Sequence, residues 1–118
     1  MVVNIVPYTK VEALEWEPHP MLKHVKIKPL LSKKKDKADI TCYLVSVPKG
    51  GEITEHIHEK SDDIIYVLKG KAKMFIEGDG EFDLVPGVFV RVPKNTKHRV
   101  YDFEEDFLAY DVFVPPIL

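Results

Sequence analysis

Short runs of alternating hydrophobic and polar residues, separated at close intervals by glycine and proline, make up most of the chain. Alternation with a period of two is typical of strands with one buried face, and these runs are rich in the residues that favour strands: Val, Ile, Tyr and Phe. The pattern predicts an all-β protein, a sandwich or a barrel. The expected strands cover residues 21–28, 40–47, 53–58, 63–68, 72–77, 80–84, 88–92, 98–102 and 107–114.

The first 20 residues depart from this pattern. Residues 11–16 have a faint helical period, which Pro18 and Pro20 end because proline supplies no backbone N–H and restricts the residue before it. We expect residues 1–20 to form an N-terminal arm that packs on the barrel or on a partner subunit. A length of 118 residues suits one domain, which we place at residues 21–118.

Composition and charge exclude several classes of protein. A net charge of −2 gives no reason to expect a nucleic-acid or membrane partner, and the one basic run, residues 33–37, is expected to be a solvated loop. The single cysteine, Cys42, cannot form an internal disulfide and is expected to be a small buried hydrophobe. The start of the chain lacks the layout of a secretory signal, which favours a cytoplasmic protein. The absence of Gln and the abundance of Lys and Glu favour a thermophilic source.

Candidate chemistry gathers in the segment HIHEKSDD, residues 56–63. Residues two apart in a strand face the same way, so His56 and His58 can hold one metal ion while Ile57 points into an apolar layer. Asp63 begins the next expected strand and can add a carboxylate oxygen. The alternative is that the histidines are strand residues satisfied by backbone or water, and that Asp63 caps backbone N–H groups at the end of a turn.

A third histidine, His98, follows a turn in the segment VRVPKNTKHRV, residues 90–100. Pro93 fixes one backbone angle there, and Asn95 suits a left-handed turn position. His98 would face the same interior as the earlier pair if the strands close on one another.

Two spaced patterns in this region resemble the motifs of the cupins, a family of small β-barrels. The first follows G-x5-H-x-H-x3,4-E-x6-G and is met by Gly50, His56, His58, Asp63 and Gly70. The second follows G-x5-P-x-G-x2-H-x3-N and is met by Gly87, Pro93, Asn95, His98 and Asp102. Three positions are substituted: Asp63 stands for the family's glutamate, Asn95 for its glycine and Asp102 for its asparagine. The resemblance covers residues 50–102 directly.

The resemblance implies a double-stranded β-helix, or jelly-roll barrel, with His56, His58, Asp63 and His98 as metal ligands inside it. Mixed nitrogen and oxygen ligands suit a divalent transition metal: Mn, Fe, Co, Ni, Cu or Zn. Family members are commonly dimers, so we expect a homodimer.

The activity that the resemblance implies is broad. We expect a metal-dependent oxidoreductase (dioxygenase-like) or lyase (decarboxylase-like) acting on a small oxygen-rich molecule, because the sequence offers no clear general base beyond the ligands. The alternatives are a non-catalytic module that binds or senses a sugar or an organic acid, and a barrel that the ion merely stabilises.

The remaining polar candidates have simpler expected roles. His19 and His24 lie outside both motifs and are expected to be surface or packing residues. Arg91 lies between apolar neighbours, where it could hold an anionic substrate or pair with a carboxylate. Asp62, one residue from Asp63, should face outward because strand neighbours alternate.

Overall fold

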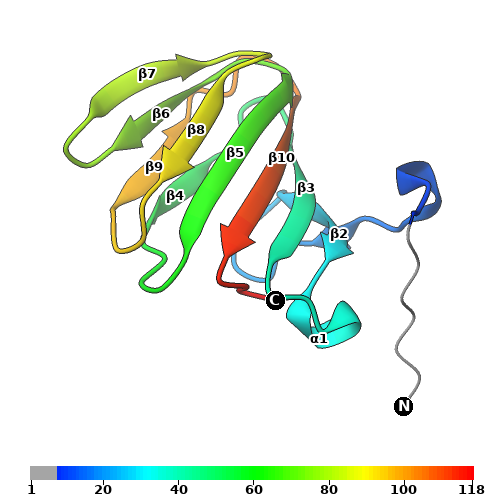
Figure 1. The fold of residues 1–118 in the computed structure, drawn as a ribbon. Helices are drawn as coiled ribbons and strands as arrows, with labels where there is room; N and C mark the ends of the chain where they lie inside the picture. The colour runs from blue at the N-terminus through cyan, green and yellow to red at the C-terminus, as the bar shows by residue number, and fades with distance from the viewer. Residues whose placement is uncertain (1–7) are drawn as a thin grey trace.

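The computed structural model describes residues 8–118 and confirms an all-β fold (Figure 1). Two antiparallel sheets face each other as the walls of a jelly-roll barrel, one with strand order β1-β2-β3-β10-β5-β8 and the other with order β4-β9-β6-β7. The strands are β1 (Glu17–Pro18), β2 (Lys26–Leu31), β3 (Thr41–Val47), β4 (Ile53–His56), β5 (Asp62–Lys69), β6 (Ala72–Ile76), β7 (Gly80–Leu84), β8 (Phe89–Val92), β9 (His98–Tyr101) and β10 (Phe107–Val114).

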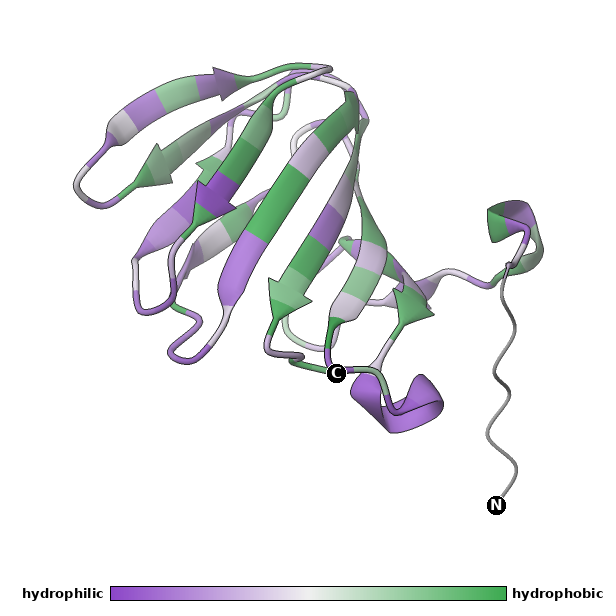
Figure 2. Cartoon of the chain, in the orientation of Figure 1, coloured by the Kyte–Doolittle hydropathy of each residue, from purple (hydrophilic) through white to green (hydrophobic). Residues whose placement is uncertain are grey.

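Strand alternation builds the core. Along β6 and β10 every second side chain is buried, as the banding of hydrophobic and hydrophilic residues in Figure 2 shows. Met74 of β6 and Phe113 of β10 are almost completely buried, and they belong to one apolar cluster between the sheets. Truncating such a residue to alanine would cost about 2–5 kcal/mol, so the core sets the shape into which the site is built.

Two of the expected strands differ clearly from the structure: the one expected over residues 21–28 runs from Lys26 to Leu31 and is wrong at both ends, and the one expected over residues 53–58 is wrong at its C-terminal end. The strand expected over residues 21–28 begins at Lys26, because the chain turns before it: His24 has φ 64° and His19 accepts backbone hydrogen bonds from Met21 and Leu22. The strand expected over residues 53–58 ends at His56, where its pairing with β9 stops.

Helical structure among the described residues is limited to a 3₁₀ turn at Val11–Ala13 and one α-helical turn, α1, at Lys33–Asp36. The basic run was expected to be a loop, and this is wrong in part, because Ser32 caps a turn of helix by accepting a hydrogen bond from Lys35 N. All four residues of the turn are solvated to some degree, with none buried. No helix in residues 8–118 has the length and apolar character needed to cross a bilayer.

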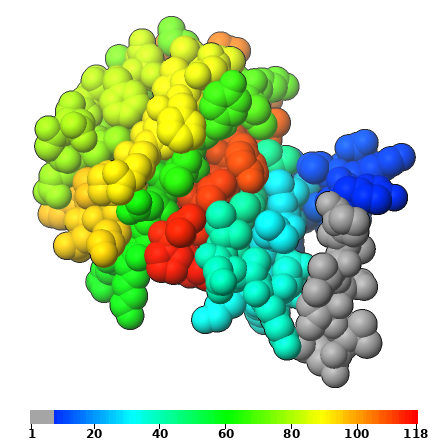
Figure 3. All heavy atoms as spheres, in the orientation of Figure 1, coloured from blue at the N-terminus to red at the C-terminus, as the bar shows by residue number. Residues whose placement is uncertain are grey.

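The N-terminal segment stands at the outer edge of the six-stranded sheet (Figures 1 and 3). Glu17 and Pro18 pair with β2, and the ammonium group of Lys28 lies 4.9 Å from the centre of the Trp16 ring. Residues 1–7 of the expected arm lie outside the described residues. That residues 1–20 form a separate arm, which packs on the barrel or on a partner subunit, stays a prediction.

Candidate metal centre

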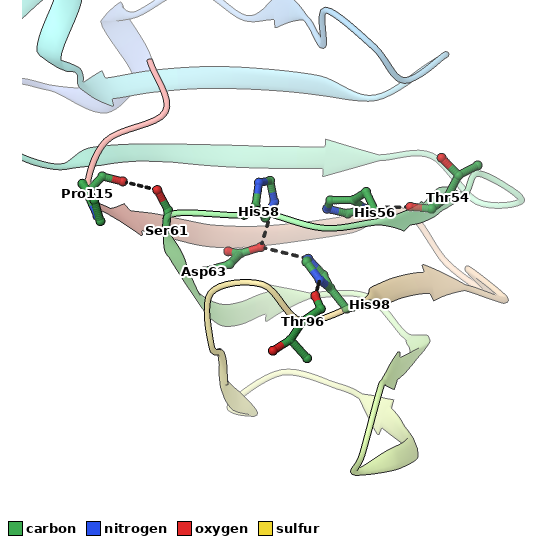
Figure 4. Close-up of polar contacts among 8 residues, drawn as sticks. All are labelled: Thr54, His56, His58, Ser61, Asp63, Thr96, His98 and Pro115. Atoms are coloured by element: carbon green, nitrogen blue, oxygen red, sulfur yellow. Dashed lines mark hydrogen bonds and ion pairs between the residues drawn. The ribbon is translucent and has the colours of Figure 1, made fainter.

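Four side chains from three parts of the barrel meet at one end of β4 and β9. His56 ends β4, His98 begins β9, and the two are direct partners across the strand pair. Asp63 lies near the start of β5 in the opposite sheet, and His58 follows β4 on the way to it. One ligand atom from each of these residues lies within 4.8 Å of the other three, and Figure 4 shows the side chains converging.

The backbone fixes the orientation of two of the histidine rings. His56 Nδ1 lies 2.7 Å from the carbonyl oxygen of Thr54, and His98 Nδ1 lies 2.9 Å from that of Thr96. A carbonyl can only accept, so each Nδ1 carries the proton and each Nε2 keeps a free lone pair. A hydrogen bond of this kind orients a metal-ligating histidine in proteins.

His58 is held by its surroundings instead of by a hydrogen bond to its ring. Although it lies outside β4, its carbonyl oxygen accepts a hydrogen bond from Asn95 N at 2.7 Å, which ties it to the turn before β9. Its ring packs edge-on against Phe113 with the ring centres 5.0 Å apart. Asn95 itself has φ 61°, the left-handed conformation that the sequence predicts for it.

Asp63 lies between two of the histidines. Its Oδ2 is 3.5 Å from His98 Nε2 and 3.8 Å from His58 Nε2, which are longer than hydrogen bonds. His98 Nε2 and Asp63 Oδ1 are buried and have no hydrogen-bond partner. Buried polar atoms are rarely left without a partner, and nitrogen and oxygen donors facing one point are what a transition metal requires. The residues therefore fit a divalent metal ion.

Burial also keeps the rings in the form that binds metal. It lowers the pKa of His56, and it lowers the pKa of His58 to about 4. The Asp63 carboxylate raises the pKa of His58 and so offsets part of this effect. Rings with lowered pKa values are neutral at pH 7, and neutral imidazole is the metal-binding form.

A pocket of about 530 Å³ opens onto the cluster, and all four side chains line it. Its walls are mainly apolar, with contributions from both sheets, from the turn after β1 and from the C-terminal residues Ile117 and Leu118. Thr41 accepts the backbone N–H groups of both C-terminal residues, which fixes this part of the wall. An ion bound by four protein groups in an open pocket would keep coordination positions for a ligand.

Asp111 is a functional candidate that the sequence analysis missed. It lies on β10, is 7% exposed, lines the same pocket and lies close enough to Asp63 for the two carboxyl groups to interact. Burial raises the pKa of Asp111 well above its usual range, and the Asp63 carboxylate raises it further. The sequence shows no clear general base beyond the ligands, whereas the structure places this carboxyl group beside them. Strand parity could have found it, because Asp111 is the single polar residue on the buried face of β10.

Several residues near the motifs lie where the sequence places them. Asp62 faces outward and pairs with Arg91 at 2.8 Å. Of the two roles expected for Arg91, binding an anionic substrate or pairing with a carboxylate, the structure shows the second. Cys42 is buried.

Two other expectations are corrected. Ile57 is 39% exposed and does not enter an apolar layer, because β4 has ended and the strand alternation with it. His24 is exposed, as expected, whereas His19 lines the pocket beside the cluster.

The fold and the site define a small β-barrel protein with a candidate metal centre, and comparison with known proteins gives the family. The model of the cupin domain matches residues 43–113, and the chain belongs to the cupin family.

Two curated relatives and one solved structure show how far the similarity extends. The chain is 32% identical over 77 residues to the pectin degradation protein KdgF of Dickeya dadantii, covering 65% of this chain and 69% of the relative. It is 43% identical over 51 residues to quercetin 2,3-dioxygenase of Bacillus subtilis, covering 43% of this chain and only 15% of the relative. The structure of KdgF from Halomonas sp. superposes with a TM-score of 0.75 at 27% identity, covering 88% of this chain and 90% of the other.

Proposed function

We propose that this protein is a metal-dependent enzyme that acts on a small oxygen-rich molecule, with His56, His58, Asp63 and His98 as its metal ligands. The observation that carries the proposal is the convergence of four potential ligand side chains on one pocket, with buried atoms of Asp63 and His98 left without a hydrogen-bond partner. The names of the relatives, a dioxygenase and a protein of pectin degradation, support a small-molecule substrate.

The bound ion would act as a Lewis acid or as a redox centre. The chain supplies the surroundings for that chemistry. The apolar walls exclude water and strengthen electrostatic interactions at the ligands. The Thr54 and Thr96 carbonyls hold the rings of His56 and His98 in a fixed orientation. The Asp111 carboxyl lies beside Asp63, where it can hold or deliver a proton at its free oxygen.

The reaction is that of an oxidoreductase or of a lyase, and oxygen dependence separates the two. Metal-loaded protein would be incubated with a flavonol, with sugar acids released from pectin and with oxalate, in air and under nitrogen. Turnover that consumes dioxygen supports an oxygenase, and turnover unaffected by nitrogen supports a lyase.

The ligand assignment is tested by elemental analysis of protein purified without added metal. We expect about one transition-metal ion per chain in the wild type and a large loss in His58→Ala. His24→Ala serves as the matched control, since His24 is exposed and lies outside the pocket. Equal metal content in wild type and His58→Ala would refute the assignment.

A non-catalytic binding or sensing module is the second candidate. Among the described residues that line the pocket, Asp111 is the one buried acidic group outside the proposed ligand set. This small number of groups that could transfer a proton favours binding without turnover. Metal-dependent binding of members of the same panel without conversion, in both wild type and Asp111→Asn, would favour this candidate. The open pocket argues against an ion whose role is only to stabilise the barrel.

The homodimer and the cytoplasmic location stay predictions. The outer face of the six-stranded sheet, part of which is visible in Figure 3, exposes large apolar side chains on β5 and β8: Tyr66, Leu68 and Phe89. Such a face suits a partner subunit. Light scattering would test it, and a monomeric mass in dilute buffer would contradict the homodimer.

A further inference from the structure

His19 holds its proton on the ring nitrogen opposite to that of His56 and His98. Its Nδ1 lies 3.0 Å from Met21 N and 3.1 Å from Leu22 N, and both backbone groups can only donate. Nδ1 must therefore be the bare, accepting nitrogen, and the proton of the neutral ring lies on Nε2. In His56 and His98 the proton lies on Nδ1 instead.

This difference makes His19 a hydrogen-bond donor instead of a further metal ligand. Its ring lines the same pocket as the cluster, and its Nδ1 edge is turned back to the backbone, so the Nε2 edge is the part left for a ligand. Burial, together with the nearby His56, lowers the pKa of His19, so the ring is neutral at pH 7. A neutral N–H group recognises an oxygen acceptor without requiring a negative charge.

The charged residues that line the pocket also favour a ligand whose acceptor group is neutral. Among the described residues that line it there is no Lys or Arg, whereas Glu55, Asp63 and Asp111 are acidic. A metal ion can neutralise an anionic group at the coordinating end of a ligand. Nothing in this lining would neutralise a second one, and burying an unpaired charge against apolar walls is unfavourable.

The walls of the pocket that holds His19 and the cluster are mainly apolar. They include Leu22, Val25, Ile27, Ile53, Ile65 and Phe113. A volume of about 530 Å³ lies in the range of pockets that enclose a small organic ligand. Apolar walls favour a flat or branched hydrocarbon body over a heavily hydroxylated one.

We infer that the pocket selects a molecule with two metal-chelating oxygens at one end, an uncharged and largely apolar body, and a neutral oxygen acceptor that binds His19 Nε2–H. This inference rests on the proposed function and narrows its substrate class. Hydroxylated aromatic ketones and related enolic carbonyl compounds fit the class, whereas dicarboxylates and sugar acids with a distant carboxylate do not. His19 is the specificity-determining residue.

Three catechols test the inference because they share a chelating head and differ in the body. They are 4-ethylcatechol, without an acceptor; 3,4-dihydroxyacetophenone, with a neutral carbonyl; and 3,4-dihydroxybenzoate, with a carboxylate. Calorimetry on the zinc-loaded full chain would give the three affinities. We expect the ketone to bind at least about tenfold more tightly than the carboxylate, since an unpaired buried charge is costly. Equal or tighter binding of the carboxylate would overturn the inference.

The role of His19 is tested by changing the protein and the ligand together. In His19→Asn the side-chain oxygen can replace Nδ1 as the acceptor of the turn, while the donor at the Nε2 position is removed. We expect the affinity for the ketone to fall about fivefold, the value of one net hydrogen bond, with that for 4-ethylcatechol unchanged within about twofold. His24→Asn, outside the pocket, should change neither. Equal losses for both ligands in His19→Asn would overturn the assignment of His19.

A second variant separates recognition from folding. In His19→Gln the amide nitrogen extends to about the position of Nε2, so part of the preference for the ketone should return. A ketone preference in His19→Asn as strong as that of the wild type, or no recovery of it in His19→Gln, would refute the role of His19. Metal content, measured on every sample, separates this inference from the proposed function: wild type without metal would overturn both, whereas metal-loaded wild type without ligand preference would overturn the inference alone.

Discussion

The two ends of strands β4 and β9 differ in whether their polar side chains have partners. At the end that holds His56 and His98, polar atoms of Asp63, His98 and Asp111 are buried without partners. At the other end an open pocket of about 690 Å³ lies beside the starts of β4 and β6. Four of its charged groups form ion pairs with each other, Lys71 with Glu104 at 3.3 Å and Lys73 with Asp83 at 3.8 Å.

This difference distinguishes a candidate metal site from an ordinary charged surface. Exposed charges that pair with each other are also solvated, so they need no further ligand and contribute little to stability. Buried donors that face one another without partners carry an energetic cost, which a bound ion would remove. The size of a pocket is therefore a poor guide here, because most charged groups of the larger pocket already pair with one another, and the hydroxyl of Tyr101 is its one buried polar atom without a partner among the described residues.

The largest expected effect comes from removing a ligand at the buried end. His98→Ala should lower the affinity for zinc on the order of 100-fold or more, since loss of a direct ligand exceeds the effect of losing an outer partner. Calorimetric titration of the metal-free protein measures it. An affinity within threefold of that of the wild type would place the metal elsewhere.

Adding metal should stabilise the fold. At a free zinc concentration of about 100 times Kd, binding to the folded state alone adds about 2.7 kcal/mol to the free energy of unfolding. Thermal melts with zinc and with a chelator would show the shift, and His98→Ala should show little of it. Identical melting curves for the wild type under both conditions would argue against a metal centre.

The metal-free protein should lose stability as the pH falls from 6.5 towards 4. The pKa of His58 is lowered from 6.5 to about 4, so over this interval the unfolded chain binds a proton that the folded chain does not. Both states hold the neutral ring above pH 6.5, where the effect is absent. Denaturant melts across the interval measure the loss, and a His58→Leu variant should show a smaller slope. A slope unchanged by this substitution would assign the acid sensitivity to other groups.

The smallest effect is expected at the opposite end of the barrel. Lys73→Ala removes a side chain that pairs with Glu81 and Asp83 and is 43% exposed. The free energy of unfolding should change by no more than about 1 kcal/mol, and zinc affinity should not change. A loss of more than 2 kcal/mol in denaturant melts would mean that these exposed pairs support the fold as strongly as the core does.

Much of the fold and the composition of the cluster could be predicted from local patterns. The expected bounds of β7 and β10 agree with the structure, because each strand has clear alternation and a turn residue at its ends. The N-terminal limit of β2 was wrong because His19 and His24 shape a turn through contacts that no periodicity encodes.

The sequence by itself determined the strand pattern, the family motifs and the identity of four candidate ligands, because these depend on residue type and on spacing along the chain. Only the tertiary structure decided which other groups join them. Asp111 and His19 lie 48 and 44 residues from Asp63 along the chain, by subtraction of their numbers, and neither belongs to a motif. Pairing of β10 with β5 brings the first beside the ligands, and a turn at the sheet edge brings the second into the pocket. Contacts of this kind arise when distant segments pack together, and the local sequence of neither segment specifies them.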